Sequence, residues 1–189
     1  TTGASILTDI ESVNPALLLW RSITQWLGGM GIVVLTISVL PLLGSGGINL
    51  FKAESPGPTT DRLTPKFKDT AKLLWLSYAG LTLIETLLLY FSGLDLFTAL
   101  NHSFTTLSTG GFSTLNSSVS EFSILAKWII IIFMFIAGVS FTLLLKSFRT
   151  IKALIESTEF KFYLFIVITT AVIFIPKSLS ISDTFSEAI

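Results

Sequence analysis

The stretch that decides the fold is Ser108-Thr109-Gly110-Gly111-Phe112-Ser113, which lies between two long apolar segments. A short, half-polar segment at 95–107 leads into it. As a helix this segment reaches only about 20 Å, against about 30 Å for the hydrocarbon core of a bilayer. Its apolar residues recur at helical spacing and its other face is polar. The pattern favours a half-helix followed by a re-entrant pore loop, and a surface loop between two membrane helices is the alternative.

The two glycines of this stretch indicate what such a loop would do. Non-helical backbone at membrane depth is stable only where protein buries it or where it lines a water-filled path. Gly110 and Gly111 accept backbone angles that other residues resist, so nearby carbonyls can turn toward an ion. We therefore interpret 108–113 as a candidate filter and 95–107 as its pore half-helix.

Composition places the chain among integral membrane proteins. Hydrophobic residues make up 51% of the sequence, charged residues only 13%, and the mean hydropathy is +0.78. Twelve basic and twelve acidic residues balance, which argues against a nucleic-acid partner. The absence of Cys removes thiolate chemistry, and a single His makes a zinc centre improbable. No signal peptide is visible, and a first residue other than Met suggests an excerpt from a longer protein.

Four apolar segments predict membrane spans at 16–43, 73–92, 124–145 and 160–175, the last one stopped by Pro176. The fold class is therefore all-α. Glycines at 28, 29 and 31 allow close approach of a neighbouring helix or of a pore loop. Glu85 interrupts the second span, and we expect this possible intramembrane polar site to face protein or water, bonded to a hydroxyl or backbone group, in a structural role or in tuning conduction.

The chain contains an internal repeat. A shift of 108 residues places Thr1 on Thr109, Gly3 on Gly111 and Trp20 on Trp128. A second shift, of 88 residues, places Asp95 on Asp183, which predicts that another half-helix begins before the last residue. The repeating unit is a span, a half-helix, a filter and a second span, so about two units are present.

Longer motifs at 19–32, 53–57, 102–113 and 133–138 carry a family resemblance. With the repeated Thr-x-Gly pattern, they resemble the Trk/Ktr/HKT superfamily, most closely its bacterial TrkH-type potassium-uptake subunits. In that superfamily four such units surround one pore, and the protein is a homodimer that works with a cytosolic nucleotide-binding regulatory subunit. In plant members, a Ser at the first filter glycine accompanies sodium transport.

The resemblance implies a role for each part of the chain. It makes 1–44 the filter and helix of a first unit, 45–72 a cytoplasmic link, 73–145 the second unit with its helix at 124–145, and 146–189 a link and the start of a third unit. The implied substrate is the potassium ion, with no other cofactor, in the inner cell membrane. The implied filter residues are Thr1, Thr2, Gly3, Thr109, Gly110 and Gly111, with K⁺ at Thr2, Gly3, Gly110 and Gly111.

Three other functions are alternatives to potassium uptake. A sodium-coupled or sodium-permeable transporter of the same family differs only in the ion. A non-conducting membrane scaffold does not account for the paired Thr-x-Gly motifs. An intramembrane enzyme would use His102 with Ser103 or Ser113, but no carboxylate is placed by the sequence to orient that His.

The distribution of basic residues predicts the orientation in the membrane. Nine lie on the side of the links 44–72 and 146–159 and three on the other side, which puts the links in the cytoplasm and 4–15, 113–123 and 176–183 outside. Single cysteines at Ser55 and Ser117 should then react with an impermeant thiol reagent from opposite sides of the membrane. Labelling of both from the same side would contradict this topology.

Overall fold

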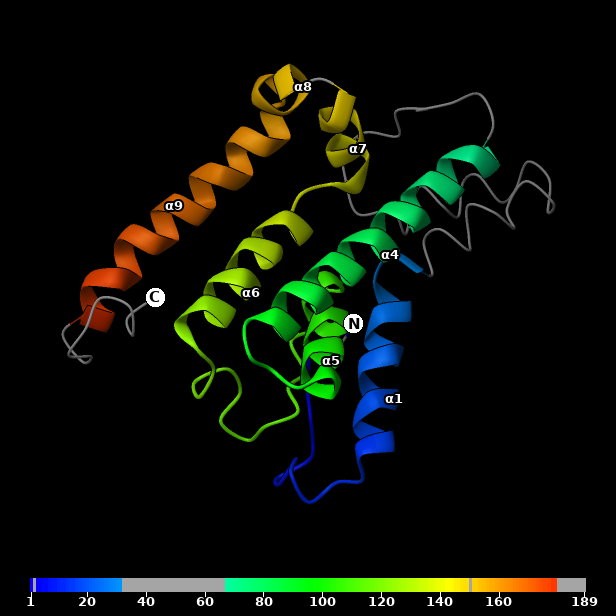
Figure 1. Ribbon diagram of the computed structural model, residues 1–189. Coiled ribbons are helices and arrows are strands. Elements are labelled where there is room, and N and C mark those ends of the chain that lie inside the picture. The colour runs from blue at the N-terminus through cyan, green and yellow to red at the C-terminus, as the bar shows by residue number, and fades with distance from the viewer. Residues whose placement is uncertain (2, 32–66, 150, 180–189) are drawn as a thin grey trace. The chain divides into compact units, whose positions relative to one another are not determined.

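The computed structural model describes residues 1, 3–31, 67–149 and 151–179 (Figure 1). The chain divides into two compact units, Thr1–Ser140 and Phe141–Ile189. Across the described residues the regular elements are helices, as the sequence predicts. Those of the first unit are α1 (Pro15–Trp26), η1 (Leu27–Gly31), α4 (Phe67–Phe91), α5 (Leu96–Leu107) and α6 (Ile124–Ala137). Those of the second unit are α7 (Phe141–Arg149), α8 (Ile151–Glu156) and α9 (Thr158–Leu179).

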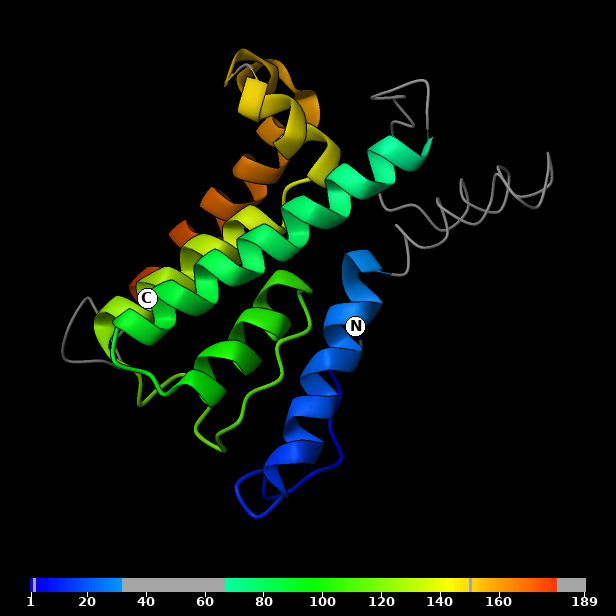
Figure 2. The ribbon, with the colours of Figure 1, turned by 45° about the vertical axis from the view of Figure 1, so that its right-hand side comes forward.

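The short helix α5 is the centre of the first unit. It packs against α1, α4 and α6, which lie around it in both ribbon views (Figures 1 and 2). Asp95 caps its start, since the carboxylate accepts a hydrogen bond from the Thr98 amide at 2.9 Å. The helix ends at Leu107. The half-helix predicted at 95–107 is thus confirmed in both position and length.

The helix α4 is the long support of this unit. Its segment Lys72–Phe91, with a mean hydropathy of 1.5, is the one stretch in the described part of the chain that is both long and apolar enough to cross a bilayer. The helix begins at Phe67, inside the predicted link 45–72. It ends before Gly93, whose φ of +103° turns the chain back toward α5. The predicted span 73–92 therefore coincides with most of α4, but the helix begins earlier than predicted, at Phe67.

An aromatic cluster joins α1, α4 and α5 at the C-terminal end of α1. The Trp26 ring lies 5.5 Å from Trp75, 5.2 Å from Tyr78 and 5.5 Å from Phe104, measured between ring centroids. Its indole N–H donates to the Thr82 hydroxyl at 3.0 Å, and the Tyr78 hydroxyl donates to the Trp26 carbonyl at 3.0 Å. These contacts fix where α1 ends relative to the other two helices.

Two predicted spans are interrupted where the sequence suggested continuous helices. The helix predicted at 124–145 stops at Ala137, and α7 starts only at Phe141. Gly138 and the β-branched Val139 are poor helix formers, and Val139 N–H bonds in a tighter turn to the Ile136 carbonyl at 3.1 Å. The helix predicted at 16–43 breaks at η1, where Gly29 has a non-helical ψ of −112°. Residues 32–43 lie outside the described part.

The prediction that Pro176 stops the last span is wrong. The helix α9 continues through this residue to Leu179. A proline removes one backbone N–H and favours a kink, but it does not by itself end a helix. The predicted third half-helix after 180 and the link residues 45–66 lie outside the described part of the chain.

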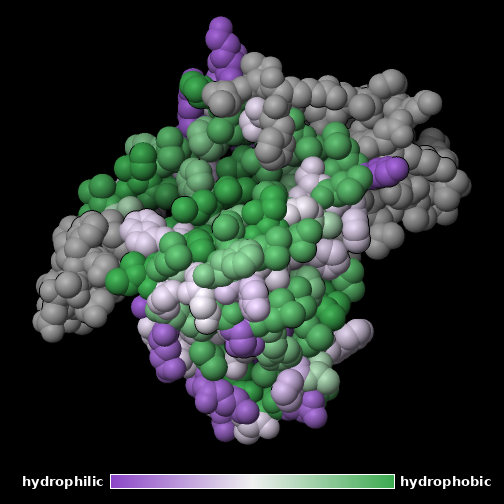
Figure 3. Space-filling view, viewed as in Figure 1, coloured by the Kyte–Doolittle hydropathy of each residue, from purple (hydrophilic) through white to green (hydrophobic). Residues whose placement is uncertain are grey.

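The surface of the first unit is divided by polarity. Hydrophobic residues cover its middle, and hydrophilic residues gather at the end where the loops 4–14 and 113–123 lie (Figure 3). Many exposed apolar side chains belong to α4, among them Leu76, Leu83, Ile84 and Phe91. An apolar middle with a polar end is the distribution that a membrane protein requires.

The Tyr78 hydroxyl provides a test of the aromatic cluster. Tyr78→Phe removes the donor to the Trp26 carbonyl and should cost about 1 kcal/mol of stability, the usual value for one hydrogen bond. The measurement is thermal unfolding of the full-length protein in detergent, with Tyr90→Phe, at an exposed tyrosine of the same helix, as control. Equal unfolding temperatures for the two variants would contradict the assignment.

Candidate filter site

The C-terminal end of α5 holds the backbone of the candidate filter. The Thr105 carbonyl accepts hydrogen bonds from two successive amides, those of Gly110 at 2.8 Å and Gly111 at 3.3 Å. Thr109 makes the reversal with a φ of +55°, a rare conformation for a residue with a side chain, and Gly111 has a φ of +78°. The chain thus leaves the helix and folds back directly over its last turn.

This arrangement sets the direction of the carbonyls. In a trans peptide the N–H and the C=O point in opposite directions, and no described peptide is cis. Because the amides of Gly110 and Gly111 point into the end of α5, the carbonyls of Thr109 and Gly110 point away from it. Of these two oxygens, that of Gly110 lies beside Gly3 of the first copy of the motif.

The first copy of the motif packs against the second. A Cβ added to Gly3 would lie 2.8 Å from the Gly110 carbonyl oxygen, closer than real side chains approach. Thr1 lies next to Gly28 of η1, and Thr2 falls outside the described residues. The structure thus brings Gly3 beside the Gly110 carbonyl, although the two residues are far apart in sequence. The prediction that these motifs bind an ion stays a prediction.

The glycines of η1 contact both motifs. A Cβ on Gly28 would lie 3.4 Å from the Thr1 nitrogen, and one on Gly29 would lie 3.1 Å from Ser108 Cα. Gly29 also allows close approach of a neighbouring helix, since an added Cβ would lie 2.9 Å from the Tyr78 hydroxyl of α4, so both roles that the sequence allowed have contacts in the structure. The break in the helix axis at Gly29 accompanies this approach.

Gln25, a residue for which the sequence predicted no role, contacts the backbone of the candidate filter. Gln25 of α1 is 3% exposed, and its Oε1 accepts a hydrogen bond from the Phe112 amide at 3.3 Å. Its carboxamide also fills the space beside Gly110, where an added Cβ would overlap it. The available signal was a polar residue within the apolar run 16–43.

The loops that follow the two motifs are braced together at the hydrophilic end. Asn116 donates to Asp9 Oδ1 at 2.8 Å, its backbone N–H donates to Glu11 Oε1 at 3.0 Å, and its Oδ1 accepts from the Ile10 amide at 2.7 Å. The bond from Asn116 holds the pKa of the exposed Asp9 carboxyl below its usual value. These contacts hold the loops 4–15 and 113–123 together, as the predicted topology requires, and the side of the membrane on which they lie stays a prediction.

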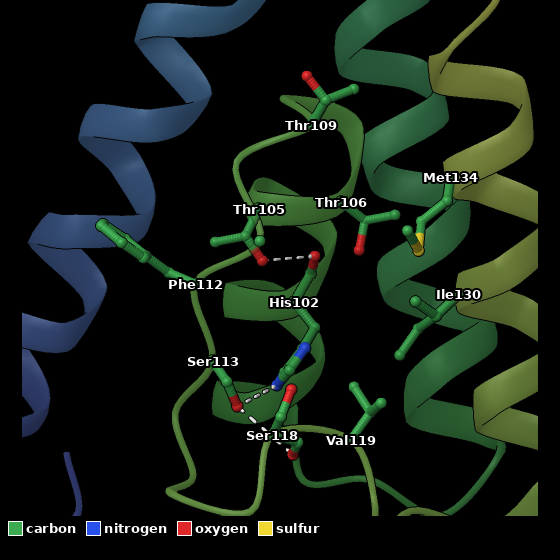
Figure 4. Close-up of a pocket in the computed structure, with 11 residues that line it drawn as sticks. His102, Thr105, Thr106, Thr109, Phe112, Ser113, Ser118, Val119, Ile130 and Met134 are labelled. Atoms are coloured by element: carbon green, nitrogen blue, oxygen red, sulfur yellow. Dashed lines mark hydrogen bonds between the residues drawn. The ribbon is translucent and has the colours of Figure 1, made fainter. Parts of the chain in front are cut away.

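A cavity of about 370 Å³ lies beside the filter (Figure 4). Its polar wall comes from α5 and the filter segment and its apolar wall from the following loop and α6. Within it His102 Nε2 lies 3.4 Å from Ser113 Oγ, and the His102 ring packs edge-on against Phe122 with centroids 4.9 Å apart. The lining residues are His102, Thr105, Thr106, Thr109, Gly111, Phe112, Ser113, Ser118, Val119, Ile130 and Met134.

These contacts bear on the enzyme alternative. The Ser103 hydroxyl donates to the Ala99 carbonyl at 2.7 Å, so it is engaged within its own helix. Among the described residues no carboxylate hydrogen-bonds to His102, which leaves the long contact to Ser113 without the orienting third group of a catalytic triad. The described residues also contain no cluster of three or more potential metal-ligating His, Cys, Asp or Glu side chains.

Glu85 is buried, as expected for a carboxyl within a span. It is 0% exposed and lies near the Thr106 hydroxyl of α5, but neither carboxyl oxygen has a hydrogen-bond partner of good geometry among the described residues. Its burial in protein agrees with one of the two surroundings expected, whereas the expected bond to a hydroxyl or backbone group has no counterpart of good geometry among the described residues. Whether it serves structure or conduction stays open to test.

Comparison with known proteins gives consistent matches over nearly the whole chain. The model of the TrkH family, described as cation transport protein, matches residues 1–181. The Trk system potassium uptake protein TrkH of Escherichia coli K12 is 43% identical over 177 residues, covering 92% of this chain. The crystal structure of the potassium transporter TrkH from Vibrio parahaemolyticus superposes with a TM-score of 0.75 at 31% identity, covering 98% of this chain.

The chain spans less than two-fifths of the length of these proteins. It corresponds to 37% of the Escherichia coli relative and 38% of the chain in the crystal structure. A Halomonas elongata TrkH is 45% identical over 151 residues, which are 79% of this chain and 31% of the relative.

The contact between Gly110 and Gln25 gives a direct test of this site. Gly110→Ala adds a methyl that overlaps the carboxamide and should destabilise the full-length protein by about 1–3 kcal/mol, as overpacking does. In a Gln25→Ala background the overlap disappears, so the same change should cost much less. Thermal unfolding in detergent measures both costs.

The matched control is Gly80→Ala in α4, where an added Cβ meets nothing within 4 Å. A Gly-to-Ala change inside an open helix surface should be neutral or slightly stabilising. An equal cost of Gly110→Ala in both backgrounds would show that Gln25 does not occupy this space.

Proposed function

The chain belongs to the TrkH family of cation transport proteins, and from that premise we propose that the whole protein takes up potassium across the cell membrane through a channel-like pore. Residues 1–3 and 109–111 contribute backbone carbonyls to its selectivity filter. The observation that carries the proposal is the pair of hydrogen bonds from Gly110 and Gly111 to the Thr105 carbonyl. These bonds support the proposal because they turn the carbonyls of Thr109 and Gly110 away from α5, where they can face an ion path.

The mechanism follows from the chemistry of the ion. Potassium must lose water to pass a narrow filter, and a set of carbonyl oxygens replaces the hydration shell. Gly3 leaves room for the Gly110 carbonyl, so the two motifs can present oxygens to one ion without a side chain between them. Small residues suit this task better than carboxylates, which would bind the ion too tightly to release it.

The helix α5 adds an electrostatic contribution. Its C-terminal end, which is the negative end of the helix dipole, lies against the filter. A partial negative charge there stabilises a dehydrated cation in the membrane interior. The buried Asn101 side chain ties α5 to α1, since its Oδ1 accepts a hydrogen bond from the Ser22 hydroxyl at 2.6 Å.

A sodium-coupled or sodium-permeable transporter of the same family is the alternative. The family description covers cation transport in general, whereas the relatives are named for potassium. The ion preference is therefore the quantity to measure first. Enzyme activity has no comparable support, since the relatives are named as transporters.

The proposed setting is the inner cell membrane, in a homodimer that works with a cytosolic nucleotide-binding regulatory subunit. The relatives' names, which assign them to a Trk system, support a multi-component assembly. The exposed apolar face of α4, including Leu83 and Leu87, suits contact with lipid or with another part of the full-length protein.

Replacement of the filter glycines tests the proposal. Gly3→Ser places a side chain against the Gly110 carbonyl, and Gly111→Ser puts a residue with a Cβ at a φ of +78°. Each should lower the preference for potassium over sodium by about tenfold, the factor that corresponds to about 1.4 kcal/mol. The loss is partial because other filter segments are unchanged.

The measurement is rubidium uptake by cells that lack other potassium uptake, with and without competing sodium. Immunoblots of the membrane fraction control for the amount of protein. Wild-type preference in both variants, at equal protein levels, would show that these residues do not line the filter.

A further inference from the structure

Gln25 connects the helix that follows the first motif to the backbone of the second motif. It lies on α1, in the last turn before η1, and is buried with Leu18 and Ser22 on one face. Figure 2 shows α1 running beside α5 and the segment that follows it. A buried amide at such a junction requires a specific partner, because an unpaired polar group would be costly there.

The partner of its oxygen is the third amide of the filter. Oε1 accepts a hydrogen bond from the Phe112 N–H at 3.3 Å, and the carboxamide lies against the Gly110 backbone. The helix α1 also holds the Phe112 ring, since the Arg21 guanidinium lies over it at 4.2 Å from its centroid. Phe112 is therefore fixed by α1 at both its backbone and its side chain.

This bond completes a pattern that α5 begins. Thr105 holds the amides of Gly110 and Gly111, which directs the carbonyls of Thr109 and Gly110. The carbonyl opposite the Phe112 amide is that of Gly111, and it points away from Gln25 for the same reason of peptide geometry. Three successive peptides of the candidate filter are thus held by hydrogen bonds from their amides, two accepted by the Thr105 carbonyl and the last by Gln25.

We propose that Gln25 is a positioning residue that determines ion specificity, because its side-chain oxygen sets the direction of the Gly111 carbonyl in the filter. This proposal rests on the proposed function, since it assumes that the Gly111 carbonyl lines the ion path. Loss of the acceptor frees the peptide between Gly111 and Phe112 to rotate. A filter with one unfixed carbonyl adapts to a smaller ion and discriminates less against sodium.

The neighbouring residues show that the helix itself does not require an amide here. Ser22, one turn earlier on the same face, donates to Asn101 of α5 at 2.6 Å and has no bond to the filter. The repeat shift of 108 places Ser22 and Gln25 on Ile130 and Phe133, which are the buried residues at the same places in α6. An apolar side chain therefore satisfies helix packing at this position.

The experiment compares three variants of the full-length protein by rubidium uptake and its inhibition by sodium. Gln25→Leu removes the acceptor at similar size and should lower the rubidium-over-sodium preference about fivefold, the factor expected for one hydrogen bond, with the protein level unchanged. Gln25→Glu retains an acceptor oxygen and should stay closer to wild type. Ser22→Ala removes a buried hydroxyl of the same helix face and should retain the wild-type preference.

Several outcomes would overturn the inference. These are wild-type preference in Gln25→Leu, equal losses in Gln25→Leu and Ser22→Ala, and equal losses in Gln25→Leu and Gln25→Glu. Should Gln25→Leu not accumulate, Gln25→Asn replaces it, since its shorter side chain withdraws the oxygen from the Phe112 amide. A full-length wild type without any preference for rubidium over sodium would instead overturn the proposed function, and this inference with it.

Discussion

The rest of the first unit depends on one carbonyl, that of Thr105, which accepts hydrogen bonds from the amides of both Gly110 and Gly111. These bonds bring the chain back over the end of α5 and turn the opposite carbonyls outward. The helices α1, α4 and α6 pack around α5 and keep that carbonyl in place. At the N-terminal end of α5, Ala99 packs in a hydrophobic core with Leu89, Ala126 and Ile130. Helix packing here serves to position a few backbone atoms.

This dependence explains why small residues gather around the filter. Gly28 and Gly29 allow η1 to approach Thr1 and Ser108, and Gly3 allows the first motif to approach the Gly110 carbonyl. A methyl at Gly3 or Gly29 would push backbone away from backbone. Close contact is needed because carbonyls, unlike side chains, cannot extend toward an ion.

The sequence predicted the features that depend on local pattern and missed those that depend on contacts. The half-helix 95–107, the span near 73–92 and the burial of Glu85 follow from length, periodicity and the cost of charge in lipid. The breaks at Gly29 and Gly138 were missed because apolar composition does not distinguish a straight helix from an interrupted one. The role of Gln25 was missed because its partner is a backbone amide 87 positions away.

The repeat has a further consequence through the buried faces of α1 and α6, where Ser22 and Gln25 in one copy correspond to Ile130 and Phe133 in the other. In a pore made from identical subunits, every substitution is imposed on all of them at once. A pore encoded by duplicated segments within one chain escapes that restriction, so each copy can acquire its own support by separate mutation. The two copies here have already diverged, one toward a polar and one toward an apolar face. Two helices that correspond in the repeat can thus bury chemically different faces.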